Sequence, residues 1–304
     1  MKTIGLANGE MNASEISLGC MRINNLSEKD ASLLVHTALE EGINYFDHAD
    51  IYGGGKSEEV FAKAIGMSPS VRETVFLQSK CGIRDGYYDF SKEHILTAVD
   101  GILGRLKTDY LDTLLLHRPD TLMEPEEVAE AFRILHSSGK VRFFGVSNQN
   151  PMQIELLNRY LGHKLVIDQL QLSVTNSGMM DSGIRVNMET DRAPGDGSIL
   201  EYCRLNNITI QAWSPFQYGF FEGVFIGSEK FPELNKKLGE IAAERGVTPE
   251  AVAIAWILRH PAKIQPIVGT TNPKRLRDIC RASQVELSRK EWYGIYKAAG
   301  HQIP

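Results

Sequence analysis

The chain has 304 residues and a formal net charge of −5, from 33 basic and 38 acidic side chains. This balance provides no basic surface for binding nucleic acid, so we expect no nucleic-acid partner. No apolar run approaches the roughly 18 residues that span a bilayer, and the N-terminus lacks the apolar core of a signal peptide. We therefore expect no membrane association and a cytoplasmic location, with reduced thiols at the four cysteines.

Short apolar runs alternate with segments of helical period along the whole chain, which is typical of repeated βα units around a parallel sheet. Eight such runs predict strands within residues 16–21, 43–47, 74–80, 111–117, 141–148, 165–172, 208–215 and 263–270. Eight strands with their crossover helices fit one barrel of typical size. We expect an α/β protein in which residues 1–304 form a single (β/α)8 TIM barrel domain.

Three of the intervening segments carry clear helix signals. Ser91 is a good N-cap for a helix predicted over 91–106, and a proline in the first turn begins the helices predicted over 125–139 and 248–260. Before the first strand, Asn8 and Gly9 indicate the tight turn of a β-hairpin. We expect this hairpin to close the N-terminal mouth of the barrel.

Ionisable residues end three successive strand runs, on the side where such barrels carry their active sites. These residues are Asp47, Lys80 and His117, and Tyr52 follows five residues after Asp47. Each one alone has an ordinary explanation, as a turn aspartate, a solvated lysine or a loop histidine. Their coincidence at one rim favours a functional site, since charged groups at buried strand ends are costly unless they are paired.

The four side chains suit the protonation of a carbonyl oxygen while its carbon is reduced. A phenol with a pKa near ~10 exchanges protons poorly at neutral pH, and an adjacent ammonium lowers that pKa. We expect Lys80, held by Asp47, to act in this way on Tyr52. His117 is expected to donate a hydrogen bond to the substrate carbonyl.

Several other motifs that would indicate a phosphate, nucleotide or metal site are incomplete or absent in this sequence. Residues 53–57, GGGKS, are not a phosphate loop because position 50 is Asp50 and not glycine. No GxGxxG follows a strand, and the histidines lack the spacing of a metal site, so we expect no Rossmann nucleotide site and no metal. Two interpretations of Trp213 stay open, namely barrel packing and stacking on a flat ring in the pocket.

Several strings together resemble the aldo-keto reductases over nearly the whole chain. They are NYFDHADIYGGGKSEEVFAKAI, the lysine of LQSKCGI, the histidine of LLLHRPD, GVSN, Gln169 and AWSP. GCMRI, YYDFSKEHI and LLHRPDTLMEPEEVAEAF are most similar to the bacterial YdhF-like oxidoreductase branch. The resemblance implies NADPH-dependent reduction of small aldehydes or ketones to alcohols, with NADP(H) as cofactor. It makes Tyr52 the proton donor, Asp47 and Lys80 the pair that tunes it, and His117 the residue that orients the carbonyl.

The resemblance also implies cofactor contacts. Ser147, Asn148 and Gln169 match positions that hold the nicotinamide carboxamide, and Trp213 matches the aromatic residue that stacks on the nicotinamide. The other expected contacts are Gly19, Cys20, Met21, Asp47, Ser214, Pro215, Gly269, Thr270, Thr271 and Arg275. Of these, Thr270 and Arg275 match positions that grip the adenosine 2′-phosphate, which suits the forked donors of arginine. Two departures leave the preference for NADPH over NADH open: Gly269 replaces a common lysine, and Ile279 replaces the adenine-side asparagine.

Two other functions stay open. A strand-end lysine also suits a Schiff-base aldolase, in which Lys80 is the nucleophile. The second alternative is a nicotinamide-binding regulatory subunit with slow or no turnover and an unknown protein partner. Residues 173–197 are expected to border the pocket, and residues 216–231 either close over the cofactor pyrophosphate or form a packed loop.

Overall fold

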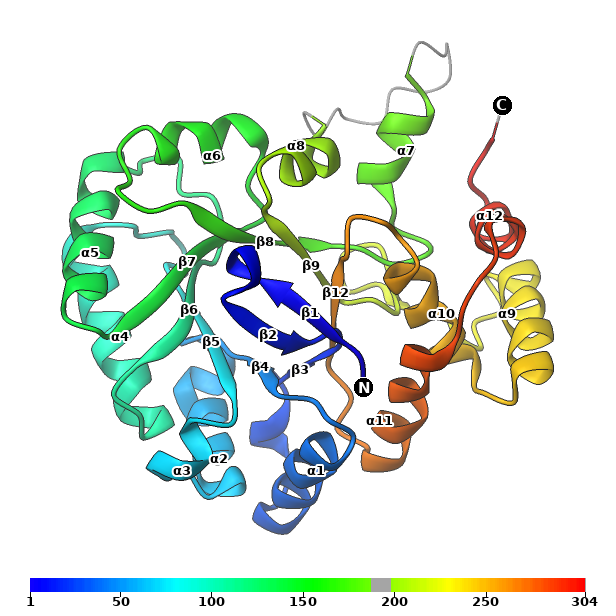
Figure 1. Cartoon of the computed structure of the whole chain (residues 1–304), viewed down its shortest axis with the longest axis horizontal. Helices are drawn as coiled ribbons and strands as arrows, with labels where there is room; N and C mark the ends of the chain where they lie inside the picture. The colour runs from blue at the N-terminus through cyan, green and yellow to red at the C-terminus, as the bar shows by residue number, and fades with distance from the viewer. Residues whose placement is uncertain (187–197, 304) are drawn as a thin grey trace.

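Eight parallel strands close into a barrel in the computed structural model, which describes residues 1–186 and 198–303 (Figure 1). The order around the barrel is β12-β3-β4-β5-β6-β7-β8-β9. The strands are β3 (Ser17–Gly19), β4 (Tyr45–Asp47), β5 (Phe76–Cys81), β6 (Leu111–Leu116), β7 (Val141–Ser147), β8 (Leu165–Gln171), β9 (Thr209–Trp213) and β12 (Gln265–Val268). Apart from the final Cys81 of β5, they lie within the predicted runs, so the prediction of a TIM barrel is confirmed.

The helices surround the barrel, and most of them contribute buried apolar side chains to the core (Figure 1). They are α1 (Glu28–Glu40), α2 (Lys56–Ile65), α3 (Pro69–Arg72), α4 (Lys92–Leu106), α5 (Pro125–Ser137), α6 (Pro151–Asn158), α7 (Gly178–Ile184), α8 (Ile199–Leu205), α9 (Pro232–Arg245), α10 (Pro249–Leu258), α11 (Pro273–Cys280) and α12 (Arg289–Ala298). The three predicted helices are confirmed as α4, α5 and α10. Ser91 caps α4 by accepting a hydrogen bond from the His94 amide. Within the described residues, no helix is both long and apolar enough to cross a membrane.

A β-hairpin lies across the N-terminal mouth of the barrel, as predicted (blue in Figure 1). Its strands β1 (Thr3–Leu6) and β2 (Met11–Ser14) are antiparallel, and Leu6 and Met11 pack against Tyr45 and Ile167 of the barrel. Leu6 pairs with Met11, so the turn spans four residues and includes the short 3₁₀ segment Ala7–Gly9. Asn8 and Gly9 both lie in this turn with left-handed φ angles of 58° and 95°, so the predicted position of the hairpin turn is confirmed.

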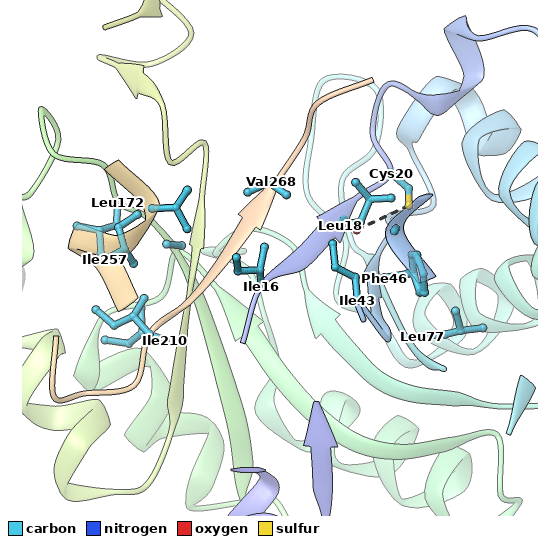
Figure 2. Close-up of a cluster of buried hydrophobic side chains, with 14 of the residues drawn as sticks. Ile16, Leu18, Cys20, Ile43, Phe46, Leu77, Leu172, Ile210, Ile257 and Val268 are labelled. Carbon is cyan, nitrogen blue, oxygen red and sulfur yellow. Dashed lines mark hydrogen bonds between the residues drawn. The ribbon is translucent and has the colours of Figure 1, made fainter. Parts of the chain in front are cut away.

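The core lies between the barrel wall and the helices and consists of aliphatic and aromatic side chains. Figure 2 shows part of it, with Leu18, Phe46, Ile210 and Val268 drawn from four different strands. All four are fully buried, and each burial contributes about 1.5–3 kcal/mol to the hydrophobic stabilisation. This packing holds the strand ends, and the residues that follow them, in fixed positions.

Glutamine side chains form a polar row inside the barrel. Gln169, Gln211 and Gln265 are register partners on β8, β9 and β12. The Gln211 amide donates to Gln265 at 2.8 Å, and the Gln265 amide donates to the backbone carbonyl of Ser14 in the hairpin at 2.7 Å. Buried amides are tolerated only when they are hydrogen-bonded, so this row links the hairpin to the barrel interior in one arrangement.

The segment 173–197 is only partly a loop. Residues 178–184 form α7, and Met179 and Met180 of this helix are buried in the core. These two side chains therefore do not belong to an open polar loop. Residues 187–197 of the same segment lie outside the described residues.

Candidate functional site

Asp47, Tyr52 and Lys80 meet at the C-terminal end of the barrel. The Lys80 ammonium lies 2.8 and 2.9 Å from the two carboxylate oxygens of Asp47, and both side chains are buried. It also donates to the backbone carbonyl of His48 at 2.8 Å and to the phenolic oxygen of Tyr52 at 3.2 Å. The sequence-predicted grouping of these three side chains is thus present in the fold.

Glycines directly after Tyr52 let the chain turn sharply behind the phenol. Gly53, Gly54 and Gly55 of the short 3₁₀ helix Tyr52–Gly55 have φ angles of 60°, 62° and 89°. A Cβ atom at Gly55 would also lie 2.7 Å from the side chain of Arg105. Only glycine adopts this run of left-handed conformations without strain, and the turn fixes the Tyr52 ring beside Lys80.

Lys80 is held as an ammonium. Burial by itself lowers the pKa of a lysine, but the charge of Asp47 and the contact with Tyr52 outweigh it and raise the pKa of Lys80. Its three acceptors use all three N–H donors, so no lone pair is available on the nitrogen.

The phenol of Tyr52 is held in its protonated form. Burial raises its pKa above the usual value, although the Lys80 ammonium lowers it. The expected effect of Lys80 is therefore present, but the expectation of a lowered net pKa was wrong, because desolvation is the larger effect. Since Lys80 can only donate, the Tyr52 oxygen accepts from it, and the phenolic hydrogen points away from Lys80.

His117 follows β6 and lies beside the phenol. Its ring meets the Tyr52 ring edge-on at a centroid distance of 5.9 Å, and its Nδ1 atom is buried without a partner among the described residues. Burial and the positive charges of Lys80 and Arg118 hold the pKa of His117 well below its usual value. All four predicted site residues are thus brought together, with a neutral imidazole next to a neutral phenol.

This environment predicts the titration behaviour of His117. Because burial and two neighbouring cations disfavour the imidazolium, we expect its ring resonances not to shift between about pH 5.5 and 8, where an ordinary histidine titrates. NMR of histidine-labelled protein measures this, with His117→Gln to assign the signal. A midpoint near pH 6.5 for His117 would contradict the geometry.

Two glutamines hold the Asp47 carboxylate: Gln169, which the sequence analysis singled out, and Gln78, which it did not. Gln78 donates to Asp47 Oδ1 at 2.6 Å, and Gln169 donates to the same oxygen at 3.0 Å. Both amides also donate to Gln211 Oε1, at 2.8 and 3.0 Å. A signal for Gln78 and Gln211 was present in the sequence, because each is a lone amide inside an apolar strand run and needs a buried partner.

Ser147, Asn148, Gln169 and Trp213 form a connected hydrogen-bond network at the ends of β7, β8 and β9. The Ser147 hydroxyl donates to the Gln169 backbone carbonyl at 2.8 Å and accepts from the Asn148 amide at 2.7 Å. The Trp213 indole N–H donates to Asn148 Oδ1 at 3.1 Å. Asn148 takes a left-handed φ of 60°, which turns its side chain back onto this network. Trp213 is half-buried at the rim, so it is not enclosed as barrel packing would require. Its stacking on a flat ring stays a prediction.

The end of β3 lies next to Asp47. Gly19 pairs with Asp47 in the sheet, and the Cys20 amide donates to the Asp47 backbone carbonyl at 2.9 Å. Cys20 is buried, and burial together with the Asp47 charge raises the pKa of its thiol well above the usual value. Met21 is exposed at the mouth. Ser57 fixes this loop by donating to the Met21 carbonyl at 3.1 Å.

The predicted residues after β9 and β12 lie further round the rim. Ser214 has a left-handed φ of 52° and Pro215 is buried. Arg22, which the sequence analysis did not single out, crosses to donate to the Gly269 carbonyl at 2.6 Å. The other predicted positions are the half-buried Thr270 and Thr271 and the exposed Arg275 of α11. Ile279 is fully buried in the core.

A second small hairpin brings aromatic side chains to the mouth. Its strands β10 (Gln217–Tyr218) and β11 (Gly223–Val224) are paired, and its tip carries the exposed residues Phe220 and Phe221. Both rings lie near the Trp213 ring, at centroid distances of 6.3 and 6.2 Å. Residues 216–231 therefore contain a paired hairpin turn whose exposed rings lie near Trp213. Whether this segment closes over the cofactor pyrophosphate stays a prediction.

No group of three or more His, Cys, Asp or Glu side chains is placed to hold a metal in the described part of the chain. The geometry instead offers a buried ion pair, a neutral phenol, a neutral imidazole, an amide network and an aromatic rim. This donor set suits a polar carbonyl and a flat ring with an amide.

The sequence profile described as "Aldo/keto reductase family" matches residues 15–299. The chain is 38% identical to the uncharacterized oxidoreductase YcsN of Bacillus subtilis, with 100% of both chains covered. It is 33% identical to a 6-dehydroglucose reductase of Agrobacterium fabrum, with 98% of each covered, and 34% identical to the oxidoreductase YdhF of Escherichia coli, with 92% of this chain and 91% of that protein covered.

Solved structures agree with this similarity. A thermostable aldo-keto reductase in complex with the inhibitor epalrestat superimposes with a TM-score of 0.80 at 26% identity, covering 98% of this chain and 100% of that one. A Bombyx mori aldo-keto reductase in complex with NADP shares the fold, with a TM-score of 0.76 at 21% identity and coverage of 97% and 92%. The chain is an oxidoreductase that belongs to the aldo/keto reductase family.

Proposed function

We propose that this protein reduces small aldehydes and ketones to alcohols with NADPH and that Tyr52 supplies the proton. The observation that carries the proposal is the Lys80 ammonium, which is bound to both Asp47 and the Tyr52 oxygen. A phenol in this position has its hydrogen free for the pocket and an adjacent positive charge to stabilise phenolate.

The proton transfer follows from this arrangement. A carbonyl oxygen that accepts a hydrogen bond from Tyr52 receives the phenolic proton as negative charge develops on it. Lys80 then stabilises the resulting phenolate, and Asp47 keeps Lys80 charged. His117, neutral and edge-on to the phenol, orients the carbonyl oxygen through a ring N–H. The nicotinamide cofactor, when bound, supplies the hydride to the carbonyl carbon.

The residues at the ends of β7 to β9 fit a nicotinamide ring. The two amide hydrogens of Gln169 are used by Asp47 and Gln211, so its carbonyl oxygen is the group left to accept from a carboxamide. Asn148 fixes the Trp213 indole, which offers a flat face at the rim. In this proposal Gly19, Cys20 and Met21 lie at the ribose, and the residues after β9 and β12 hold the phosphates and adenosine.

Arg275 tests the preference for NADPH. Its guanidinium is exposed and forms no ion pair with a described residue, so it is available for the 2′-phosphate. We expect Arg275→Met to raise the KM for NADPH about 10- to 100-fold and to leave the KM for NADH unchanged, as for the loss of one charge-assisted contact. Steady-state kinetics with both cofactors measure this.

Arg277 on the same helix is the matched control, because its guanidinium is already paired with Glu40 at 3.0 Å and with Glu41 at 3.7 Å. Arg277→Met is expected to leave the KM for both cofactors unchanged. Equal losses with NADPH and NADH in Arg275→Met would mean that this arginine does not read the 2′-phosphate.

The geometry disfavours the aldolase alternative. A Schiff base needs a neutral amine that is free to attack, whereas Lys80 is held charged by three acceptors. The regulatory alternative predicts cofactor binding without turnover, so measurements of binding and of turnover distinguish it from the proposed reductase. The proposal includes a small carbonyl substrate and a cytosolic location, which the four free, buried cysteines support.

The function is tested by following NADPH absorbance with a panel of aldehydes, ketones and quinones. Turnover of at least one carbonyl class, with the alcohol identified as product, supports the proposal. Tight NADPH binding without any turnover would favour the regulatory subunit instead. Fluorescence titration of the cofactor makes the two results distinguishable, since it reports binding independently of turnover.

A further inference from the structure

Arg118 is an arginine at the mouth whose charge has no partner among the described residues. It directly follows His117 at the end of β6 and is half-buried. Its guanidinium lies over the faces of Trp213 and Phe220, at 5.5 and 5.6 Å from their ring centroids. A guanidinium over an aromatic face keeps its N–H edge free for a ligand in the plane of the group.

The nearest carboxylate along the chain is already used. Both oxygens of Asp120 accept backbone amides, from Phe90 at 3.0 Å and from Leu122 at 2.9 Å. Arg72 and Arg105, which are also buried or half-buried, are by contrast paired with acidic side chains at 2.6 and 2.7 Å. Arg118 is therefore a positioned cation with free donors next to the proposed catalytic residues.

The surroundings of Arg118 add an apolar surface. Phe220 and Phe221 are 62% and 53% exposed, and their rings together with Trp213 form a rim beside the guanidinium. A flat apolar body can pack on such rings, while an anionic group meets the guanidinium in a forked pair.

From this arrangement we infer that the preferred substrates are carbonyl compounds that carry an anionic group, with Arg118 as the residue that binds the anion. The inference rests on the proposed carbonyl reduction and names the substrate class for that site. An aryl or short aliphatic spacer separates the carbonyl from the anion. The carbonyl then reaches Tyr52 and His117 while the anion pairs with Arg118.

The test compares 4-carboxybenzaldehyde with the neutral 4-formylbenzamide, which has almost the same shape. The ratio of their kcat/KM values is measured for the wild type, Arg118→Met and Arg118→Lys. We expect Arg118→Met to lower this ratio about tenfold or more. Arg118→Lys is expected to retain part of the ratio, because it keeps the charge but not the fork.

Arg84→Met is the matched control, because Arg84 follows the neighbouring strand β5 and lies 3.6 Å from Asp89. In Arg84→Met, the ratio of kcat/KM for 4-carboxybenzaldehyde to kcat/KM for 4-formylbenzamide is expected to equal that of the wild type. Glyceraldehyde 3-phosphate against glyceraldehyde tells a phosphate from a carboxylate as the preferred anion. An unchanged ratio in Arg118→Met, or an equal loss with both benzaldehydes, would overturn the inference.

A binding measurement keeps the inference separate from the proposed function. Calorimetry compares 4-(hydroxymethyl)benzoate with 4-(hydroxymethyl)benzamide, both added to the protein with NADP⁺. Tighter binding of the benzoate that is lost in Arg118→Met supports anion recognition, even if no aldehyde is turned over. Equal binding of both compounds by the wild type would overturn the inference, even if neutral aldehydes are reduced.

Discussion

Tyr52→Phe is expected to reduce kcat for carbonyl reduction about 10²- to 10⁴-fold, the usual contribution of a positioned proton donor. The phenylalanine ring keeps the packing against His117 but removes the hydroxyl that accepts from Lys80. Lys80 retains Asp47 and the His48 carbonyl as acceptors, so the fold should be preserved. Stopped-flow measurement of single-turnover NADPH oxidation gives the chemical step directly.

The affinity for NADPH provides the first control and should stay at the wild-type value in Tyr52→Phe. Tyr88→Phe provides the second, because Tyr88 lies exposed on the loop after β5. Its kcat should equal that of the wild type. If Tyr52→Phe retains more than about a tenth of wild-type kcat, the proton comes from another group and the proposed role of Tyr52 fails.

Lys80→Met is expected to affect both stability and turnover. It leaves the Asp47 carboxylate buried without its cation, and such a change typically costs about 3–5 kcal/mol of unfolding free energy. It also removes the charge that stabilises the Tyr52 phenolate, so kcat should fall about 10²-fold or more. Urea unfolding and single-turnover kinetics measure the two effects.

The double variant Asp47→Asn with Lys80→Met separates the two effects. Removing both charges together avoids the uncompensated carboxylate, so more than half of the lost stability should return. The turnover should not return, because the phenolate still lacks its ammonium. Recovery of turnover together with stability would show that Lys80 acts only through the fold.

The residues proposed for proton transfer could be found from the sequence because of where they stand in their strands. Asp47, Lys80 and His117 interrupt apolar runs at or near the C-terminal end, and parallel strands of a barrel bring these ends to one rim. That reasoning needs only the strand boundaries, and these are set locally by the hydrophobic periodicity and by turn residues. It therefore indicated a shared site without any knowledge of distances.

The electrostatics of the site could not be predicted in the same way. The sign of the effect of Lys80 on Tyr52 was correct, but burial raises the pKa of Tyr52 by more than the ammonium lowers it. Burial depends on how the glycine turn after Tyr52 packs against neighbouring elements, which no local pattern contains. The pKa of His117 likewise depends on burial and on the charges of Lys80 in β5 and of Arg118 in the segment after β6.

The sequence by itself determined the barrel, the hairpin at its N-terminal mouth and the strand ends at which the ionisable groups stand. These features follow from local periodicity, caps and turns, which act over a few residues. Only the tertiary structure decided that Gln78 and Gln211 join Asp47 in one network and that Arg118 lies over Trp213. Such contacts join distant strands, and they depend on register and on barrel closure, which are properties of the whole chain.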